Sequence, residues 1–171
     1  YQLGQSLLHD NDLNFNQIIF TDDDKMNFEF QHFVKNVDQG YRVDLCRWNW
    51  NKRFAPLTTD SGQSLSVRAA AGYQPTGCYV TRDNVYNFRA DGTWQITRDA
   101  KQVSADGDTH GTGRLTATIL RHYQLSDEID LGQSGKFVAP VSGELYVRCR
   151  DRWNKLSDNS GTVQLNISLD H

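Results

Sequence analysis

Oxygen-bearing side chains are concentrated in one stretch near the end of the chain, Asp151-Arg-Trp-Asn-Lys-Leu-Ser-Asp158-Asn159-Ser-Gly161. This stretch follows one predicted strand directly and precedes another, so a loop fixed at both ends brings Asp151 back towards Asp158 and Asn159. Calcium takes about six to eight oxygen ligands, and two carboxylates, one amide and backbone carbonyls supply such a set without thiol or imidazole. An Asp-Asn-Ser-Gly turn is also a common way to join strands, so the residues by themselves leave both interpretations open.

The elements that must position this loop are short strands. Residues 163–169 place Val, Leu, Ile and Leu on one side and Gln, Asn and Ser on the other, which is the period of a half-buried strand. Turn residues occur at 81–84, 90–93 and 141–143. The chain is therefore predicted to be all-β, a two-sheet sandwich of jelly-roll type. The predicted strands cover 64–70, 78–82, 84–90, 93–97, 114–120, 135–139, 143–150 and 161–169.

Composition changes near residue 60, which divides the chain into an N-terminal extension at 1–60 and a β-sandwich domain at 61–171. In the extension a helix is predicted from apolar residues at helical spacing: Met26, Phe30, Phe33, Val34 and Val37. Thr21 and residues 22–24 suit its N-terminus, and Gly40 suits its end. The alternation of Met26, Phe28, Phe30 and His32 leaves a strand open as the alternative.

The segment after the helix is predicted to be a strand at 41–45, extended by Trp48 and Trp50. Three roles remain open for the extension: an extra layer on the sandwich, a dimer contact, or the tail of a preceding domain. The aromatic run at 48–54 is interpreted as buried packing, with a second contact surface as the alternative.

The bulk properties exclude several classes of protein. A net charge of −3 with scattered Lys and Arg argues against nucleic acid as a partner. No apolar run approaches the roughly 18 residues of a membrane span. The chain begins at Tyr1, which leaves a removed export signal open. Cys46, Cys78 and Cys149 form no metal-binding spacing, so they are interpreted as free thiols, with a Cys78–Cys149 disulfide as the alternative.

Catalytic motifs are absent from the sequence. It contains no GxSxG, HExxH or P-loop pattern. The run Asp106-Gly-Asp108-Thr-His110 could bind a metal or supply an acid, yet polar residues are expected in any Gly-rich loop. With 21 Asp and Glu in the chain, a chance pair of acids for glycoside hydrolysis is easy to find. The protein is therefore predicted not to be an enzyme.

Two segments near the C-terminus, 143–151 and 158–167, together resemble the C-terminal signature of the PA-IL-like galactose-binding bacterial lectins. Weaker similarity extends upstream in the same order, through Thr76–Val80, Val85–Trp94, Ala105–Gly107 and Gly113–Ile119. The resemblance covers roughly residues 64–169 and leaves 1–60 unexplained. It implies a galactose-binding-like jelly roll and a calcium ion whose coordination the sugar completes with two hydroxyls.

Carried over by position, the resemblance implies a definite set of metal ligands. Asp151, Asp158 and Asn159 would contribute side-chain oxygens, and Lys155 a backbone carbonyl. A further carbonyl would come from about Thr97. The chain departs from the family pattern at Asp158, where the family has an amide, a change that keeps an oxygen and adds negative charge.

The sugar side of the implied site is less complete. The family's sugar-contacting His has no clear equivalent, so Asp106 and His110 are the candidate contacts in the middle loop. Asp151 and Asp158 would contact the sugar beside the ion. Trp153 is expected to fold inward and fix the loop, with stacking on a pyranose as the alternative, and Arg152 is expected to face water, with donation to a sugar hydroxyl as the alternative.

The predicted function is a calcium-dependent carbohydrate-binding module, for a galactoside or related glycan, from a secreted, cell-surface or periplasmic protein. Its partner would be a glycan, and an oligomer is compatible with the sequence. An adhesion module with a purely structural calcium is the alternative. A glycan-active enzyme ranks third, because it would need an acid pair in a deep cleft.

Overall fold

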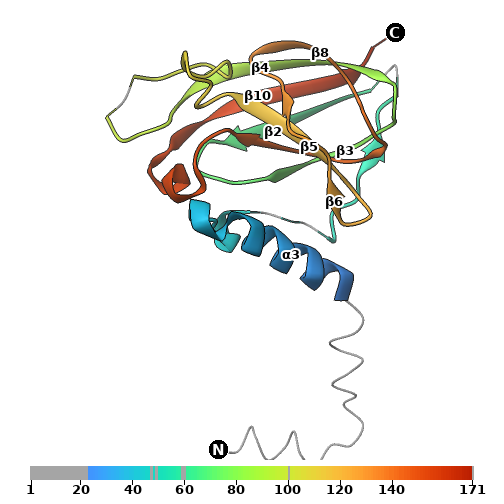
Figure 1. The fold of residues 1–171 in the computed structure, drawn as a ribbon. Helices are drawn as coiled ribbons and strands as arrows, with labels where there is room; N and C mark the ends of the chain where they lie inside the picture. The colour runs from blue at the N-terminus through green and yellow to red at the C-terminus, as the bar shows by residue number, and fades with distance from the viewer. Residues whose placement is uncertain (1–22, 47, 49, 59–60, 100, 171) are drawn as a thin grey trace, which may run out of the picture.

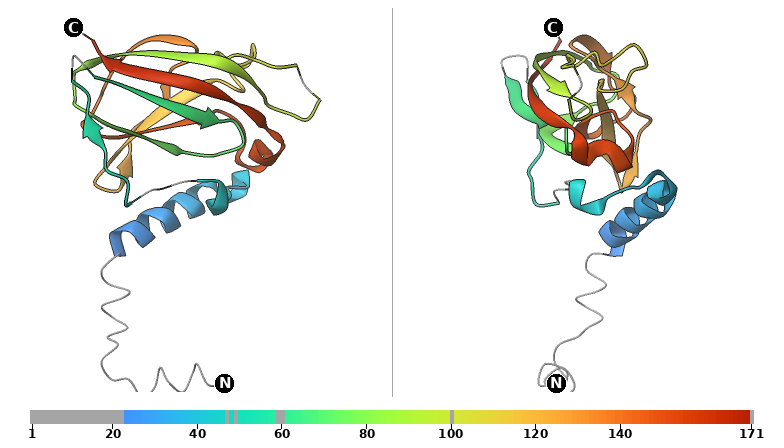
Figure 2. Two further views of the ribbon diagram at one scale, coloured as in Figure 1. Left: turned by 180° about the vertical axis from the view of Figure 1, so that it is seen from behind. Right: turned by 90° about the vertical axis from the view of Figure 1, so that its left-hand side faces the viewer.

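The computed structural model describes residues 23–46, 48, 50–58, 61–99 and 101–170. Two β-sheets form a sandwich, and a layer containing one helix packs against the six-stranded sheet (Figures 1 and 2). The predicted all-β sandwich with one helix in its N-terminal extension is thus confirmed. No helix in the described ranges is both long and apolar enough to cross a membrane.

The four-stranded sheet has the order β2-β10-β4-β8, with every pair antiparallel. Along β10 the side chains of Val163, Leu165 and Ile167 are buried while their neighbours are exposed, which confirms the alternation expected from the sequence. The strands span β2 Gly62–Arg68, β10 Ser160–Leu169, β4 Val85–Gln95 and β8 Ser134–Val138.

The predicted turn at 90–93 is wrong, because β4 continues through it as one strand. Gly92 pairs with Val163 of β10 and has a φ of 113°, so the Asp-Gly pair is absorbed into the ladder. A Cβ at Gly92 would lie 3.1 Å from the carbonyl oxygen of Thr162. The glycine therefore allows β4 and β10 to lie close together, whereas the sequence predicted a chain reversal here. The turn predicted at 81–84 does form, with the Asn84 N–H donating to the Thr81 carbonyl at 3.2 Å.

The six-stranded sheet has the order β1-β3-β9-β5-β6, and β7 also pairs with β5. Residues of β5 and β9 are buried almost without interruption, so both faces of these strands are covered. The strands span β1 Ala55–Pro56, β3 Gln74–Val80, β9 Gly143–Cys149, β5 Leu115–Arg121, β6 Gln124–Leu125 and β7 Ile129–Asp130.

The N-terminal layer contains the predicted helix, α3, at Asp23–Asn36. A 3-10 turn, η1 at Val37–Gln39, extends it, and Gly40 ends it with a left-handed φ of 73°. The strand predicted at 41–45 is wrong: η2 at Val43–Leu45 is a 3-10 turn, and Arg42 bonds the Asp44 carboxylate at 2.6 Å instead of pairing with a strand. Thr21 and Asp22, predicted at the helix start, lie outside the described residues, as does the rest of 1–22.

Most of the apolar residues that predicted the helix lie on its exposed side, and the helix packs against the sheet through another side. Met26, Phe30 and Val34 are 55%, 66% and 51% exposed, whereas Phe28 is 6% exposed. Phe28 meets Trp48 edge-on at 4.8 Å between ring centroids. The resulting aromatic cluster joins the helix-containing layer to the six-stranded sheet, as the extra-layer alternative predicted; its buried members are Phe28, Tyr41, Tyr73, Leu120, Tyr146, Trp153 and Leu156.

The main core lies between the two sheets and includes Trp94, Ile119, Leu145 and Val163, each fully buried. Cys46, Cys78 and Cys149 are all free thiols, so the disulfide alternative is not formed. Burial raises the pKa of the Cys149 thiol to about 12, which keeps it protonated and unreactive.

Candidate functional site

The acidic loop, residues 151–159, connects the end of β9 to the start of β10. Arg152 leads into a 3-10 turn, η3 at Trp153–Asp158, and Asn159 follows it in extended conformation before β10 begins. The two adjoining strands belong to different sheets, so the loop closes one end of the sandwich (Figure 1). Asp151 and Asn159 stand at the two ends of the loop, as the sequence predicted.

Three oxygens of this loop are buried without a hydrogen-bond partner. They are Asp151 Oδ2, Asp158 Oδ1 and Asn159 Oδ1, one from each of the three side chains picked out in the sequence. A buried acceptor without a donor costs about 1–3 kcal/mol, and more when it is charged. Three such acceptors in one loop form the oxygen set that a hard cation satisfies.

The pKa of Asp151 shows that the two carboxylates lie close together. Burial raises the pKa of the Asp151 carboxyl above its ordinary value, and the charge of Asp158 raises it further. The N–H of Arg152, which donates to Asp151 Oδ1 at 2.7 Å, and the Asn159 amide partly oppose the shift. The loop therefore brings two carboxyl groups together, with Arg148 as an opposing charge, and a divalent cation bound between them would favour their charged forms.

Apolar anchors hold the loop in place. Trp153 and Leu156 are 5% and 0% exposed, and the Arg148 guanidinium lies 4.3 Å from the Trp153 ring centroid. Tyr41 of the N-terminal layer meets the same ring edge-on at 4.9 Å. Trp153 thus folds inward and fixes the loop, as the favoured interpretation expected, and the alternative of a stacking surface for sugar is wrong, because the ring is buried in the aromatic cluster.

A backbone neighbour of the loop was missed by the sequence interpretation. The Asn159 amide nitrogen donates to the Ala69 carbonyl at 3.4 Å, and the Ala69 N–H donates to the Gly161 carbonyl at 3.1 Å. The turn between β2 and β3 therefore lies against the acidic loop and orients the Asn159 oxygen. The small residues at 69–72 were the available signal, since Gly72 has no room for a Cβ beside Trp153 and Cys46.

The remaining predicted metal and sugar residues of this end are exposed. Thr97 lies in a bend two residues beyond the last β4–β10 pair, Gln95–Ser160. Its hydroxyl donates to its own neighbour, the Ile96 carbonyl, at 2.7 Å. Lys155 lies within η3, and its N–H donates to the Arg152 carbonyl at 2.9 Å. Both Arg152 and Lys155 point side chains to solvent.

The middle loop reaches the same end of the sandwich, because the Gly113 N–H donates to the Arg150 carbonyl at 2.7 Å. His110 is exposed in this loop, with its N–H bonded to Asp108 Oδ1 at 2.8 Å. Asp106 turns to another neighbour, accepting the Gln133 N–H at 2.8 Å. His110 is therefore exposed in a loop that reaches this end of the sandwich, while one Asp106 oxygen already accepts a hydrogen bond.

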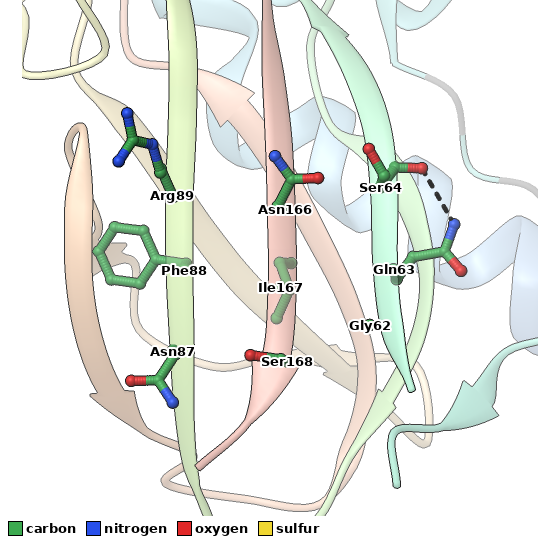
Figure 3. A pocket seen from close by; sticks show the side chains of 9 residues that line it. All are labelled: Gly62, Gln63, Ser64, Asn87, Phe88, Arg89, Asn166, Ile167 and Ser168. Carbon is green, nitrogen blue, oxygen red and sulfur yellow. Dashed lines mark hydrogen bonds between the residues drawn. The ribbon is translucent and has the colours of Figure 1, made fainter. Parts of the chain in front are cut away.

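Apart from the acidic loop, a hollow of about 390 Å³ lies on the outer face of the four-stranded sheet (Figure 3). Its polar side chains bond one another or their neighbours, as Asn87 does with Asp170 at 2.7 Å and Arg89 with Asp91 at 2.9 Å. Its apolar members, Phe88 and Ile167, are 6% and 2% exposed, so no ring face is open to a sugar. This hollow is the solvated face of the sheet and supplies no comparable site.

Comparisons with known proteins agree with the fold. No family model matches the chain, and no curated protein matches it by sequence. Among solved structures, the N-terminal domain of EclA, a PllA-like lectin, is similar with a TM-score of 0.51 and 17% identity, over 63% of this chain and 96% of that one. The chain therefore has a lectin-like β-sandwich fold.

Two further structures are more distant. A functionally unknown conserved protein from Bacillus anthracis str. Ames has a TM-score of 0.39 at 16% identity, over 63% of this chain and 21% of that one. The IMPa metallopeptidase in complex with T-antigen has a TM-score of 0.39 at 17% identity, over 71% of this chain and 14% of that one. Similarity at this level adds nothing to the assignment.

Proposed function

We propose that this protein is a non-catalytic carbohydrate-binding module of the PA-IL-like lectin type, in which the acidic loop holds a calcium ion. The observation that carries the proposal is the set of three buried oxygens of Asp151, Asp158 and Asn159 that lack hydrogen-bond donors. The similarity to a PllA-like lectin domain supports the same assignment through the fold. Secretion or surface display fits a module of this kind.

Calcium is favoured over other metals by the chemistry of the ligands. Carboxylate, amide and carbonyl oxygens suit a hard cation such as calcium, whereas zinc and copper prefer the imidazole and thiolate ligands that this loop lacks. Backbone carbonyls near Lys155 and Thr97 would complete the set. The bound ion would offer coordination positions to vicinal sugar hydroxyls.

The residues around the ion would orient the sugar. His110, with its exposed ring, and Arg152, exposed beside Asp151, are the available donors. Since Trp153 is buried, sugar binding here would depend on polar contacts. This arrangement predicts modest affinity and strong dependence on calcium.

Thermal unfolding with calcium and with chelator tests the metal. Calcium at about 100 times its dissociation constant adds about 2.7 kcal/mol, which raises the melting temperature by roughly 5–10 °C in a domain of this size. Asp158→Asn and Asn159→Ala should reduce this shift at a fixed calcium concentration, and Asp127→Asn, an exposed acid elsewhere, should keep it. An unchanged melting temperature in saturating calcium would disprove the metal site.

The alternative, an adhesion module with structural calcium only, is favoured by one observation: Trp153 is buried and Asp106 is partly committed, which leaves few groups for a sugar. A glycan array with calcium and with chelator separates the two functions. Calcium-dependent glycan binding that Arg152→Ala weakens without changing the thermal shift supports the lectin. A thermal response without any calcium-dependent glycan signal supports the adhesion module.

A further inference from the structure

A second pocket, which we name the hairpin pocket, lies at the opposite end of α3 from the acidic loop. It has a volume of about 660 Å³, within the range of small-ligand sites. In Figures 1 and 2 the β5–β6 hairpin descends towards the start of α3, whereas the acidic loop meets its end. The pocket is lined by Lys25, Trp50, Tyr79, Arg82, Leu120, Arg121, His122, Tyr123, Ser142, Gly143 and Glu144.

The pocket forms where the N-terminal layer stops covering the six-stranded sheet. Glu144 of β9 pairs with Tyr79 of β3 on one side and with Leu120 of β5 on the other. Directly paired residues project from the same face of a sheet, so these three side chains form the floor. Two residues along β9, Tyr146 is fully buried under the aromatic cluster.

Aromatic rings form the walls, and they are open to solvent. Tyr79 and Tyr123 are 37% and 38% exposed, two of the few large aromatic side chains on the described surface. Trp50 packs against Tyr123 with 5.8 Å between ring centroids, and its indole N–H donates to Glu29 at 2.9 Å. Exposed rings fixed at a pocket wall suit stacking on the C–H face of a pyranose.

The hairpin that presents Tyr123 is strained. Its two turn residues, His122 and Tyr123, have φ values of 46° and 59°, both left-handed. The turn closes between Arg121 and Gln124, a geometry in which Asn-Gly is the favoured pair. Left-handed backbone costs roughly 1–2 kcal/mol for each ordinary residue. Such strain is concentrated at functional sites, and here it holds a ring and an imidazole at the pocket edge.

The charges of the pocket differ from those of the whole protein. Lys25, Arg82 and Arg121 contribute three positive charges against one carboxyl, Glu144, in a chain of net charge −3. Arg82 has only an exposed contact with Asp83 at 3.5 Å, and Arg121 makes no salt bridge in the described part of the chain. Guanidinium groups recognise carboxylate and sulfate through paired hydrogen bonds.

We propose that the hairpin pocket binds an acidic saccharide without calcium. Its anionic group would meet Arg82 and Arg121, and its ring would stack on Tyr123. Glu144 would accept hydrogen bonds from hydroxyls, which a sugar has and an acidic peptide lacks. Because this site and the acidic loop lie at opposite ends of α3, the module would bind two parts of one glycan or two glycans.

Calorimetry in chelator tests the pocket apart from the calcium loop. The probes are tetragalacturonate, which carries carboxylates only, a sulfated carrageenan tetrasaccharide, which carries sulfates only, the neutral β1,4-galactotetraose and a tetraglutamate peptide. We expect at least one acidic saccharide to bind at least tenfold more tightly than the neutral sugar and the peptide. Which acidic probe binds identifies carboxylate or sulfate as the anion.

Variants then place the binding in the pocket. The double variant Arg82→Gln with Arg121→Gln should lower the affinity for the acidic probe at least tenfold. Tyr123→Asn, which tolerates the left-handed turn, should lower it about tenfold. Arg89→Gln on the far sheet and Asp151→Ala in the calcium loop should leave it unchanged. No binding in chelator, equal binding of the neutral sugar or peptide, or full binding by the pocket variants would overturn the proposal without affecting the thermal test of calcium.

Discussion

The two outer faces of the sandwich differ in their contact with solvent: one is polar and exposed, and the other is covered by the N-terminal layer. On the four-stranded sheet, β10 alternates buried and exposed residues, and polar side chains such as Asn166 meet water directly (Figure 3). On the six-stranded sheet, β9 is buried on both sides, and its outward Tyr146 lies beneath aromatic residues of the N-terminal layer. The first sheet is complete as a two-layer structure, whereas the second needs a third layer.

Both candidate sites lie at the limits of this third layer. Gly40, just past η1, abuts Asn154 of the acidic loop, and Lys25, near the start of α3, lines the hairpin pocket. Where the layer ends, the sheet edge and its loops are exposed while their bases stay packed. The layer therefore positions sites at its ends, which a bare polar sheet face cannot do.

The largest expected effect comes from removing a ring that joins the layer to the sheet. Phe28→Ala should lower the free energy of unfolding by about 3 kcal/mol, because Phe28 is buried between Trp48 and Trp50. Phe30→Ala, two residues away on the same helix and 66% exposed, should change it by less than about 0.5 kcal/mol. Urea unfolding of both variants measures the contrast, and equal losses would show that the helix packs through another face.

The next largest effect on stability is expected at Arg148, which forms a partly buried ion pair and also stacks on an aromatic ring. Arg148 bonds Glu128 at 3.0 Å with its side chain 10% exposed, and its guanidinium stacks on Trp153. Arg148→Ala should cost about 2 kcal/mol, since it removes the stack and leaves Glu128 with one charged partner, Arg150 at 3.2 Å, beside the Thr116 hydroxyl at 2.7 Å. A double-mutant cycle with Glu128→Gln should give a coupling energy of about 1 kcal/mol; a value near zero would mean that stacking carries the whole effect.

The sequence predicted the fold well where buried and exposed residues alternate along a strand. It predicted the fold less well where the N-terminal layer covers the sheet. Val163, Leu165 and Ile167 identified β10 correctly. The helix was found from Met26, Phe30 and Val34, yet these residues point outward, because the aromatic side chains of residues 28 and 32 pack more tightly against the sheet. Helical spacing alone does not show which face is buried.

The sequence picked out the three side chains whose buried oxygens lack partners, but it did not predict the residues that surround them. Asp151, Asp158 and Asn159 are adjacent in sequence to strand ends, so chain geometry brings them together. The contact of Asn159 with Ala69 joins residues 90 positions apart, and no local pattern encodes it. The hairpin pocket escaped the sequence interpretation for the same reason, since its residues come from several turns and from the layer.

Acid should weaken the third layer before it affects the open sheet. Burial, with Lys35 and Arg148 nearby, lowers the pKa of His32 from 6.5 to about 4. Because the unfolded chain takes up this proton first, stability is complete above pH 6.5 and falls as pH drops towards 4. The loss should be about 1–2 kcal/mol, reduced from full linkage because the ring is only partly buried. His32→Phe should flatten the urea-unfolding profile over this range, and His110→Phe, exposed, should not.

The smallest expected effect belongs to the open sheet. Arg89 and Asp91 form an ion pair at 2.9 Å, with side chains 72% and 48% exposed. Solvent screening reduces such a pair to a few tenths of a kcal/mol, so Arg89→Ala should change the free energy of unfolding by less than about 0.5 kcal/mol. Its double-mutant coupling with Asp91→Asn should fall below that of Arg148 with Glu128 at every salt concentration. Couplings of equal size would mean that the third layer shields its ion pair no better than open water does.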